Sequence, residues 1–144
     1  MAEDTKINND EIDIPLGDSA EEIKKRKQII KNFYASWNDA HPDKKVWNKS
    51  LRAYIYVKYI SINETVGHAS ISFASTLAVL NLTDILERAV IIKKSPAKSN
   101  DKNQRPFDQM IVMTYQGIRL LVGHQKSTGE YVQYCITKKA SLGR

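Results

Sequence analysis

The segment from Phe107 to Thr137 constrains the fold of this chain most strongly, because two turn sequences fix how three β-prone runs align. Gln116-Gly117 separates the first two runs, and glycine takes the positive φ of a tight hairpin turn without steric cost. This turn sets three pairs of residues opposite one another: Tyr115 with Ile118, Met113 with Leu120, and Ile111 with Val122. Because a one-residue slip would turn every side chain to the other face, the pattern predicts an antiparallel hairpin with one buried face.

A second turn joins this hairpin to the third run. Ser127-Thr128-Gly129 is typical of a three-residue loop with glycine in the left-handed conformation. This loop predicts three further pairs: His124 with Val132, Val122 with Tyr134, and Leu120 with Ile136. The three runs then agree on the buried face, so the segment is predicted to form a three-stranded meander.

The length and the cysteine content narrow the class of protein. A chain of 144 residues is expected to fold as one domain and to bury a core without disulfides. The single Cys135 has no internal partner, and no close His pair suggests zinc, so we expect no metal or cofactor and a reducing compartment. No apolar run approaches the roughly 20 residues of a membrane span, and no signal pattern opens the chain. A cytoplasmic location is therefore expected.

The charge is unevenly distributed along the chain. The formal net charge is +6, yet residues 1–18 hold six acidic residues against one lysine, which leaves about +11 on the remainder. We predict an acidic mobile tail over residues 1–18 and a single domain over residues 19–144. A basic body attracts RNA or another polyanion through counterion release, whereas the alternative is a surface tuned only for solubility.

One strong helix signal follows this tail. Ser19 and Glu22 form a capping box, which satisfies amide groups at the start of a helix, and Pro42 bars its extension. The sequence predicts a helix from Ala20 to about Asn38. Its apolar residues recur at spacings that place them on one face: Ile23, Ile30, Phe33, Tyr34 and Trp37.

The middle of the chain predicts shorter elements. Aromatic and β-branched residues dominate from Ala53 to Ile60, which indicates a strand that pairs with the meander, and residues 46–51 suggest a short helical turn. Ser61 and Glu64 form a second capping-box match, which predicts a helical turn leading to His68. A further helix is predicted over residues 83–90.

Together these elements predict an α+β fold. An N-terminal helix and two or three short helical segments pack on an antiparallel sheet of about four strands, which ends in the three-stranded meander.

Residues 93–105 predict a long, mobile, basic loop with a formal net charge of +4. Such a loop either binds phosphates or serves as a solvated connector between elements. Its candidate nucleic-acid-binding residues are Lys93, Lys94, Lys98, Lys102 and Arg105.

Candidate catalytic residues are scattered, because no phosphate loop, nucleophile elbow or zinc motif is present. His68 carries an imidazole, the side chain most often used as a general acid or base, and Glu64 one helical turn earlier can orient it or share its proton. A plain surface pair is the alternative. Arg119, beside Thr137 in the predicted sheet, can hold a phosphate, although a cross-strand surface arginine is the alternative. We expect a structural role for His124 near the end of its strand, a surface loop position for His41 beside Pro42, and a packing role for Cys135.

From Ala53 to Thr137 the chain resembles the small nuclease-like domains associated with large polyvalent proteins of phages and mobile elements, a branch of the barnase, EndoU, colicin and RelE-like ribonuclease group. The matching residues are the strand Tyr54 to Ile60, the segment Ser61-Ile62-Asn63-Glu64-Thr65-Val66-Gly67-His68, in which that branch places a His, the helical Leu82 to Val90, and the meander Ile111 to Ile136.

The resemblance implies metal-independent RNA cleavage through the ribose 2′-hydroxyl. It implies that His68 is the acid or base, that Arg119 contacts the phosphate, and that Thr137 assists. The chain departs from the pattern because no Glu sits in mid-strand as a partner base. The rival hypothesis is a non-enzymatic accessory module that binds protein or nucleic acid through its basic surface. An enzyme requires His68 in a cleft with a second polar group in reach, whereas a binding module requires only contiguous charge or an apolar patch.

Overall fold

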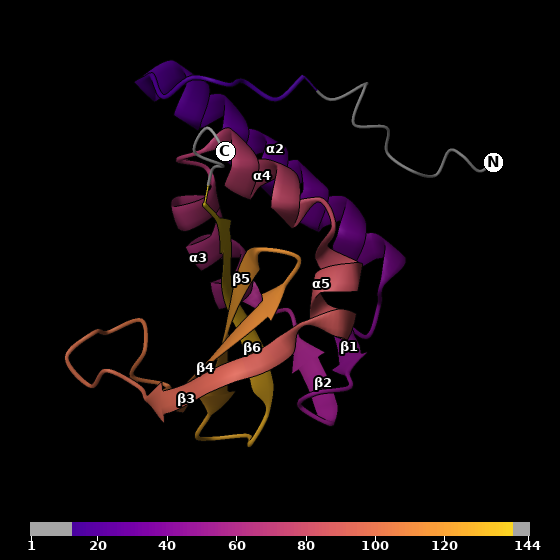
Figure 1. Cartoon of the computed structure of the whole chain (residues 1–144), viewed down its shortest axis with the longest axis vertical. Helices are drawn as coiled ribbons and strands as arrows, with labels where there is room; N and C mark the ends of the chain where they lie inside the picture. Colours follow the sequence, from indigo (N-terminus) through magenta and orange to yellow (C-terminus); the bar gives the residue numbers. More distant parts are fainter. Residues whose placement is uncertain (1–12, 140–144) are drawn as a thin grey trace.

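A computed structural model describes residues 13–139, which form one six-stranded sheet and four helices (Figure 1). The helices are α2 (Ala20–Ala40), α3 (Tyr59–Ala69), α4 (Phe73–Val79) and α5 (Leu82–Arg88). The strands are β1 (Lys45–Asn48), β2 (Ala53–Tyr56), β3 (Val90–Pro96), β4 (Phe107–Tyr115), β5 (Ile118–Gln125) and β6 (Tyr131–Lys138). The predicted α+β class is confirmed.

The predicted sheet of about four antiparallel strands is wrong in number and order. The strands lie in the order β1-β2-β6-β5-β4-β3, and β2 pairs with β6 in parallel. The sequence predicts a short helical turn over residues 46–51, where β1 lies, and a mobile loop from residue 93, where β3 lies. Both β1 and β3 are edge strands of the sheet, so each has only one neighbour to define it.

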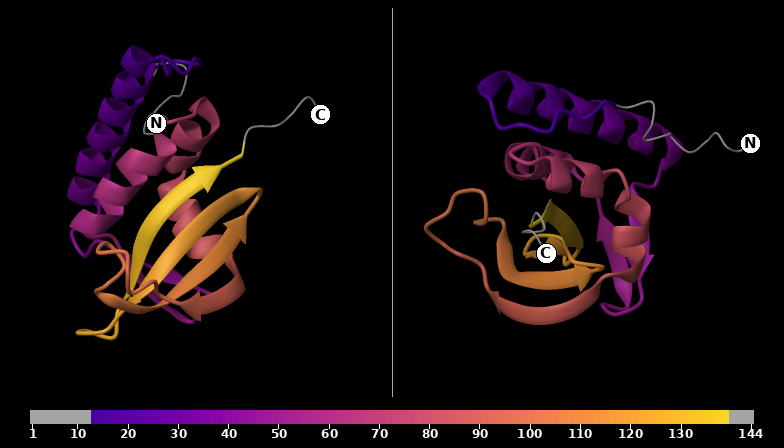
Figure 2. Two further views of the ribbon diagram at one scale, coloured as in Figure 1. Left: turned by 90° about the vertical axis from the view of Figure 1, so that its left-hand side faces the viewer. Right: turned by 45° about the horizontal axis from the view of Figure 1, so that its top comes forward.

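The main core lies between the helices and one face of the sheet. Figure 2 shows α2, α3 and α4 together on one side of a strongly curved sheet. Residues from both layers are buried there, among them Ile30, Tyr34, Ile55, Leu82, Ile85, Leu86, Ile111, Met113, Leu120 and Ile136. The apolar face predicted for the first hairpin is therefore the face that packs on the helices.

The N-terminal helix begins as predicted and runs to Ala40, two residues beyond the expected end at Asn38. Its capping box is formed: the Glu22 amide donates to Ser19 Oγ (3.1 Å), and the Ser19 amide donates to Glu22 Oε1 (3.3 Å). On the same helix Arg26 is fully buried.

Arg26 connects three segments of the chain. Its Nε donates to the carbonyl of Ser70 and its Nη1 to the carbonyl of Pro15, each at 2.7 Å. Ile14 is also buried, so Ile14 and Pro15 are anchored on the domain although they belong to the predicted tail, whereas Leu16 is exposed. The rest of that tail, residues 1–12, lies outside the described residues.

The register of the meander is confirmed in its first hairpin and changes in the second. Tyr115 pairs with Ile118, Met113 with Leu120, and Ile111 with Val122, as predicted. Leu120 also faces Ile136, but Tyr134 is an extra, unpaired residue that forms a bulge in β6, so that Val122 faces Gln133 and His124 faces Tyr131. The predicted partners Tyr134 and Val132 are therefore wrong. An extra residue in one strand reverses the faces beyond it, which turn chemistry alone does not reveal.

Three predictions between β1 and α5 need correction. The strand predicted to reach Ile60 ends at Tyr56, because α3 begins at Tyr59. Ser61 lies inside the first turn of α3, where its Oγ accepts from the Lys58 amide (2.9 Å), so it is not the N-terminal cap. The helix predicted over residues 83–90 is α5, which runs from Leu82 to Arg88, and β3 begins at Val90.

The helix α4 had no counterpart in the prediction. It occupies the small, apolar stretch after α3, and Ser72 caps it by accepting from the Ser75 amide (3.1 Å). Ser75 Oγ in turn contacts the backbone of Lys138 at the end of β6.

A smaller apolar cluster lies on the opposite face of the sheet. It comprises Phe107, Met110, Val132, Tyr134 and Cys135. The loop of residues 97–106 borders this cluster through Ala97, and it is held by its own hydrogen bonds, including one from the Lys98 amide to Gln104 Oε1 (2.9 Å). The structure thus replaces the predicted mobile loop with an edge strand and a shorter, hydrogen-bonded loop.

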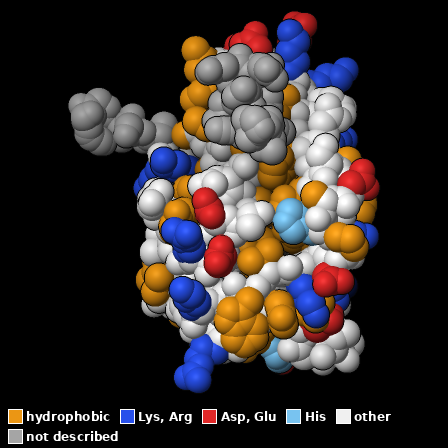
Figure 3. Space-filling model, turned by 90° about the vertical axis from the view of Figure 1, so that its right-hand side faces the viewer, with side chains coloured by type: hydrophobic (Ala, Val, Ile, Leu, Met, Phe, Trp, Pro, Cys, Tyr) orange, Lys and Arg blue, Asp and Glu red, His pale blue; other side chains and the backbone are white. Residues whose placement is uncertain are grey.

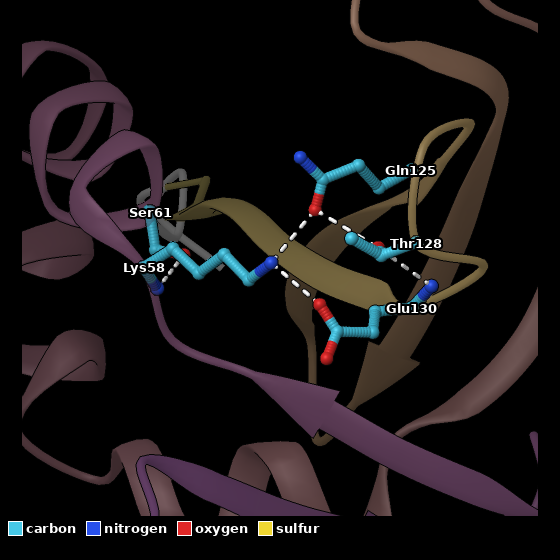
Figure 4. Close-up of polar contacts among 5 residues, drawn as sticks. All are labelled: Lys58, Ser61, Gln125, Thr128 and Glu130. Atoms are coloured by element: carbon cyan, nitrogen blue, oxygen red, sulfur yellow. Dashed lines mark hydrogen bonds and ion pairs between the residues drawn. The ribbon is translucent and has the colours of Figure 1, made fainter.

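The junction between β2 and α3 is tied to the turn between β5 and β6 (Figure 4). Lys58 Nζ donates to Gln125 Oε1 (2.7 Å) and lies 2.6 Å from Glu130 Oε1. The hydrogen bond from Lys58 lowers the pKa of Glu130. The Glu130 amide donates to Thr128 Oγ1 (3.1 Å), which orders the turn itself.

Among residues 13–139, the helices are all too short or too polar to cross a membrane.

Candidate functional site

The helix α3 presents the predicted pair of titratable residues. Glu64 and His68 are four residues apart, so they lie on the same face of the helix. Glu64 Oε1 is 3.3 Å from His68 Nε2. The side chain of His68 is 57% exposed, whereas that of Glu64 is 9% exposed. A solvent-accessible imidazole is therefore held by a buried carboxylate.

The buried carboxylate is fixed from a second direction by the loop of residues 97–106. Asn103 Nδ2 donates to Glu64 Oε2 at 2.9 Å. The two oxygens of Glu64 thus have separate partners, one on the loop and one on the next turn of α3. Because both oxygens are engaged, the carboxylate can hold the imidazole ring in one orientation.

Tyr134 on β6 lies within the electrostatic influence of the same carboxylate. Burial raises the pKa of the Tyr134 phenol, and the negative charge of Glu64 raises it further. The phenol therefore stays protonated at physiological pH and keeps its capacity to donate a hydrogen bond.

Arg119 and Thr137 occupy the adjoining part of the sheet. They face each other across β5 and β6, and Cys135 lies two residues before Thr137 on the same strand. Burial raises the pKa of the Cys135 thiol to about 11, the Arg119 charge acts to lower it, and the Glu64 charge raises it. Arg119 and Thr137 are therefore neighbours in the sheet, whereas the hydrogen bonds and ion pairs of the described residues do not connect Arg119 with Glu64 or His68.

The predicted phosphate-binding residues are divided between two elements. Lys93 and Lys94 lie on β3, at the edge of the sheet, whereas Lys98, Lys102 and Arg105 lie on the loop. All five side chains are exposed. Lys102 precedes Asn103, so the loop brings one of the five next to the residue that contacts Glu64.

The remaining histidines have structural contacts. His124 Nδ1 is 2.8 Å from Asp108 Oδ1, and its ring lies 5.0 Å from that of Tyr131. The ring of His41 stacks on Trp37 at 4.0 Å, although the sequence suggested a surface loop position. Cys135 is buried in the smaller apolar cluster, in agreement with its expected packing role.

The sequence therefore identified the Glu64–His68 pair but missed two residues around it. Asn103 and Tyr134 are distant from α3 in sequence, and no local spacing links them to it. Only the path of the loop and the bulge in β6 bring them to Glu64. Within residues 13–139 no group of three or more His, Cys, Asp or Glu residues is arranged to hold a metal ion.

Comparisons with protein-family models, with curated proteins and with solved structures found no match to this chain.

Proposed function

We propose that this chain is an RNA-directed nuclease-like domain that cleaves RNA through the ribose 2′-hydroxyl without a metal ion. The observation that carries the proposal is the exposed imidazole of His68, held at 3.3 Å by a buried carboxylate that has its own second support. An acid or base for RNA cleavage must be accessible to substrate and fixed in orientation, and this pair meets both needs.

In the proposed reaction, His68 accepts the proton of the 2′-hydroxyl as that oxygen attacks the adjacent phosphorus. The bond from phosphorus to the 5′-oxygen breaks, and the leaving oxygen takes a proton from the protonated imidazole or from water. The products are a 2′,3′-cyclic phosphate and a free 5′-hydroxyl. Glu64 orients the imidazole, while the positive charge of Arg119 stabilises the charge on the phosphate.

The test is cleavage of single-stranded RNA in the presence of a chelator. The proposal expects a 2′,3′-cyclic phosphate product and no cleavage of an RNA whose 2′-hydroxyls are replaced by hydrogen. His68→Ala should lower the rate by roughly 10²- to 10⁴-fold, the usual contribution of a positioned acid or base. Arg119→Ala should lose a comparable share through the phosphate charge.

His124→Gln is the matched control, because it removes an imidazole that is bonded to Asp108 and is absent from the proposed site. Its rate should stay near that of the unmodified protein. Cleavage that survives His68→Ala, or no metal-independent cleavage at all, would refute the proposal and favour a non-enzymatic accessory module.

A further inference from the structure

The β1–β2 hairpin has one buried and one outward face, and the outward face carries exposed aromatic rings beside a lysine. Val46 and Ile55 pair across the two strands and point to the main core. Successive side chains on a strand alternate between faces, so the neighbouring pairs point away from that core. These pairs are Trp47 with Tyr54 and Lys45 with Tyr56.

The aromatic rings on this face are open to solvent. Trp47 is 47% exposed and Tyr54 is 43% exposed, and their ring centroids lie 5.1 Å apart in an edge-to-face arrangement. Tyr59, at the start of α3, is 80% exposed. Among residues 13–139, the aromatic residues in the set of exposed large hydrophobic side chains are these three, and they come from consecutive elements.

Cationic side chains lie directly among the rings. Lys45 Nζ is 4.4 Å from the centroid of the Tyr54 ring and 5.6 Å from that of Tyr56, while Lys58 Nζ is 5.8 Å from the Tyr56 ring. Lys58 is paired with Glu130, so Lys45 supplies the cation on this face that has no ion pair of its own among the described contacts. Figure 3 views the side of the molecule that bears β1 and β2, and it shows hydrophobic side chains next to Lys or Arg side chains.

Further cations flank the two strands. Lys44, Lys49 and Arg52 are exposed at or near the ends of β1 and β2. The acidic residues close to them in sequence or through the Lys58 pair are Asp43 and Glu130. The positive residues outnumber the negative ones, so the charge of this face complements a polyanion.

Cation–π contacts alone would explain the lysines but not the exposed rings, because exposing so much aromatic surface to water is unfavourable. Unpaired nucleobases stack on aromatic side chains while the phosphates contact Lys and Arg, and this combination matches the composition of the face. Bases in a duplex are already stacked on one another and offer no free faces to such rings.

We propose that the outward face of the β1–β2 hairpin, with Tyr59, is a stacking platform for an unpaired polynucleotide strand. Trp47 and Tyr54 receive the bases, and Lys45 and Arg52 contact the phosphates. The platform is separate from the Glu64–His68 pair and does not depend on cleavage. Tyr59 and His68 are at opposite ends of α3, about 14 Å apart along its axis, and nine residues at about 100° each place them on opposite sides of the helix.

Tryptophan fluorescence tests the platform, because a base stacked on Trp47 quenches its emission whereas Trp37 is buried. The probe is a single-stranded DNA oligonucleotide of about 12 nucleotides, a length within the usual site size for one such surface. Its lack of a 2′-hydroxyl prevents cleavage by the proposed mechanism. We expect saturable quenching by the single strand and little quenching by the same sequence as a duplex.

Single substitutions test which residues of the platform bind the oligonucleotide. Trp47→Thr and Tyr54→Thr remove the ring and introduce a β-branched residue that suits a strand, and each should weaken binding about 10-fold, as measured by oligonucleotide anisotropy. Trp47→Phe should restore most of that loss. Ile92→Thr is the matched control, because Ile92 is an exposed apolar residue on β3 at the other edge of the sheet, and it should bind normally.

The proposal is overturned if single strands and duplexes bind equally without quenching, or if Trp47→Thr and Ile92→Thr bind alike. Absence of any binding also overturns it and assigns the exposed rings to a protein partner. His68→Ala should leave the quenching unchanged, so failure of cleavage and failure of the platform are distinguishable.

Discussion

Gln133 is the residue that joins the sheet to two helices. The Tyr34 hydroxyl on α2 donates to Gln133 Oε1 (2.8 Å), and Gln133 Nε2 donates to Thr65 Oγ1 on α3 (2.7 Å). All three side chains are fully buried, and burial raises the pKa of Tyr34. A buried polar group is tolerated when its hydrogen bonds are made, and here each member depends on the others.

Replacing Gln133 by Leu should destabilise the protein by about 1–3 kcal/mol, because the buried hydroxyl of Tyr34 loses its partner. The measurement is the free energy of unfolding from urea titration. Adding Tyr34→Phe should recover part of this loss, since the orphaned hydroxyl is then gone. A double variant whose loss equals the sum of the two single losses would contradict the coupling.

The sequence did not predict this network, because it assigned Gln133 to the opposite face. The alternation of apolar residues in β6 favours Tyr134 as the inward residue, and the bulge at Tyr134 reverses that choice. Glu64 and His68 were predictable, in contrast, because four residues of helix bring their side chains together whatever the tertiary structure.

At the scale of the elements, two glycines have opposite roles. Gly123 on β5 lies under the ring of Phe107, and a Cβ added there would come within 2.6 Å of Phe107 Cδ1. Gly67 lies inside α3, and an added Cβ would meet no atom within 4 Å. The first glycine permits close packing of the smaller apolar cluster, whereas the second costs helix stability without a packing benefit.

Gly123→Ala should destabilise the protein by about 1–3 kcal/mol, since the Phe107 ring must move away. Gly67→Ala should stabilise it by about 0.5–1 kcal/mol, because alanine favours the helical backbone. Thermal unfolding of the two variants provides the comparison. A stabilising Gly123→Ala, or a clearly destabilising Gly67→Ala, would disagree with the described packing.

The strands β1 and β3 were not predicted for the same physical reason. β1 is four residues long and β3 is mostly exposed, so neither shows the apolar alternation of a half-buried strand. Their pairing with β2 and β4 defines them, and that information is not local. The long helix and the first hairpin were predictable because a capping box and a turn act within a few residues.

For the whole molecule, the charge predicts how binding responds to salt. The chain should retain short single-stranded RNA at low ionic strength and release it steeply as salt rises, because lysines and arginines displace counterions from phosphates. Reversing the charge of Lys93, Lys94 and Lys98 should weaken retention if the region from β3 to the loop takes part. Filter binding over a salt series measures both effects. A flat salt response would exclude an electrostatic origin, and unchanged affinity of the charge-reversed variant would restrict the interface to other surfaces.

The position of β6 in the sheet determines when the chain can fold during synthesis. β6 is the last strand in the described sequence, yet it lies between β2 and β5, and the β1–β2 hairpin joins the sheet through it alone. Until Tyr131–Lys138 leaves the ribosome, the hairpin, α3 and α4 lack the surface on which they pack. The N-terminal half must therefore wait, with its apolar residues uncovered, for a segment synthesised about 75 residues after β2, at roughly 5–20 residues per second.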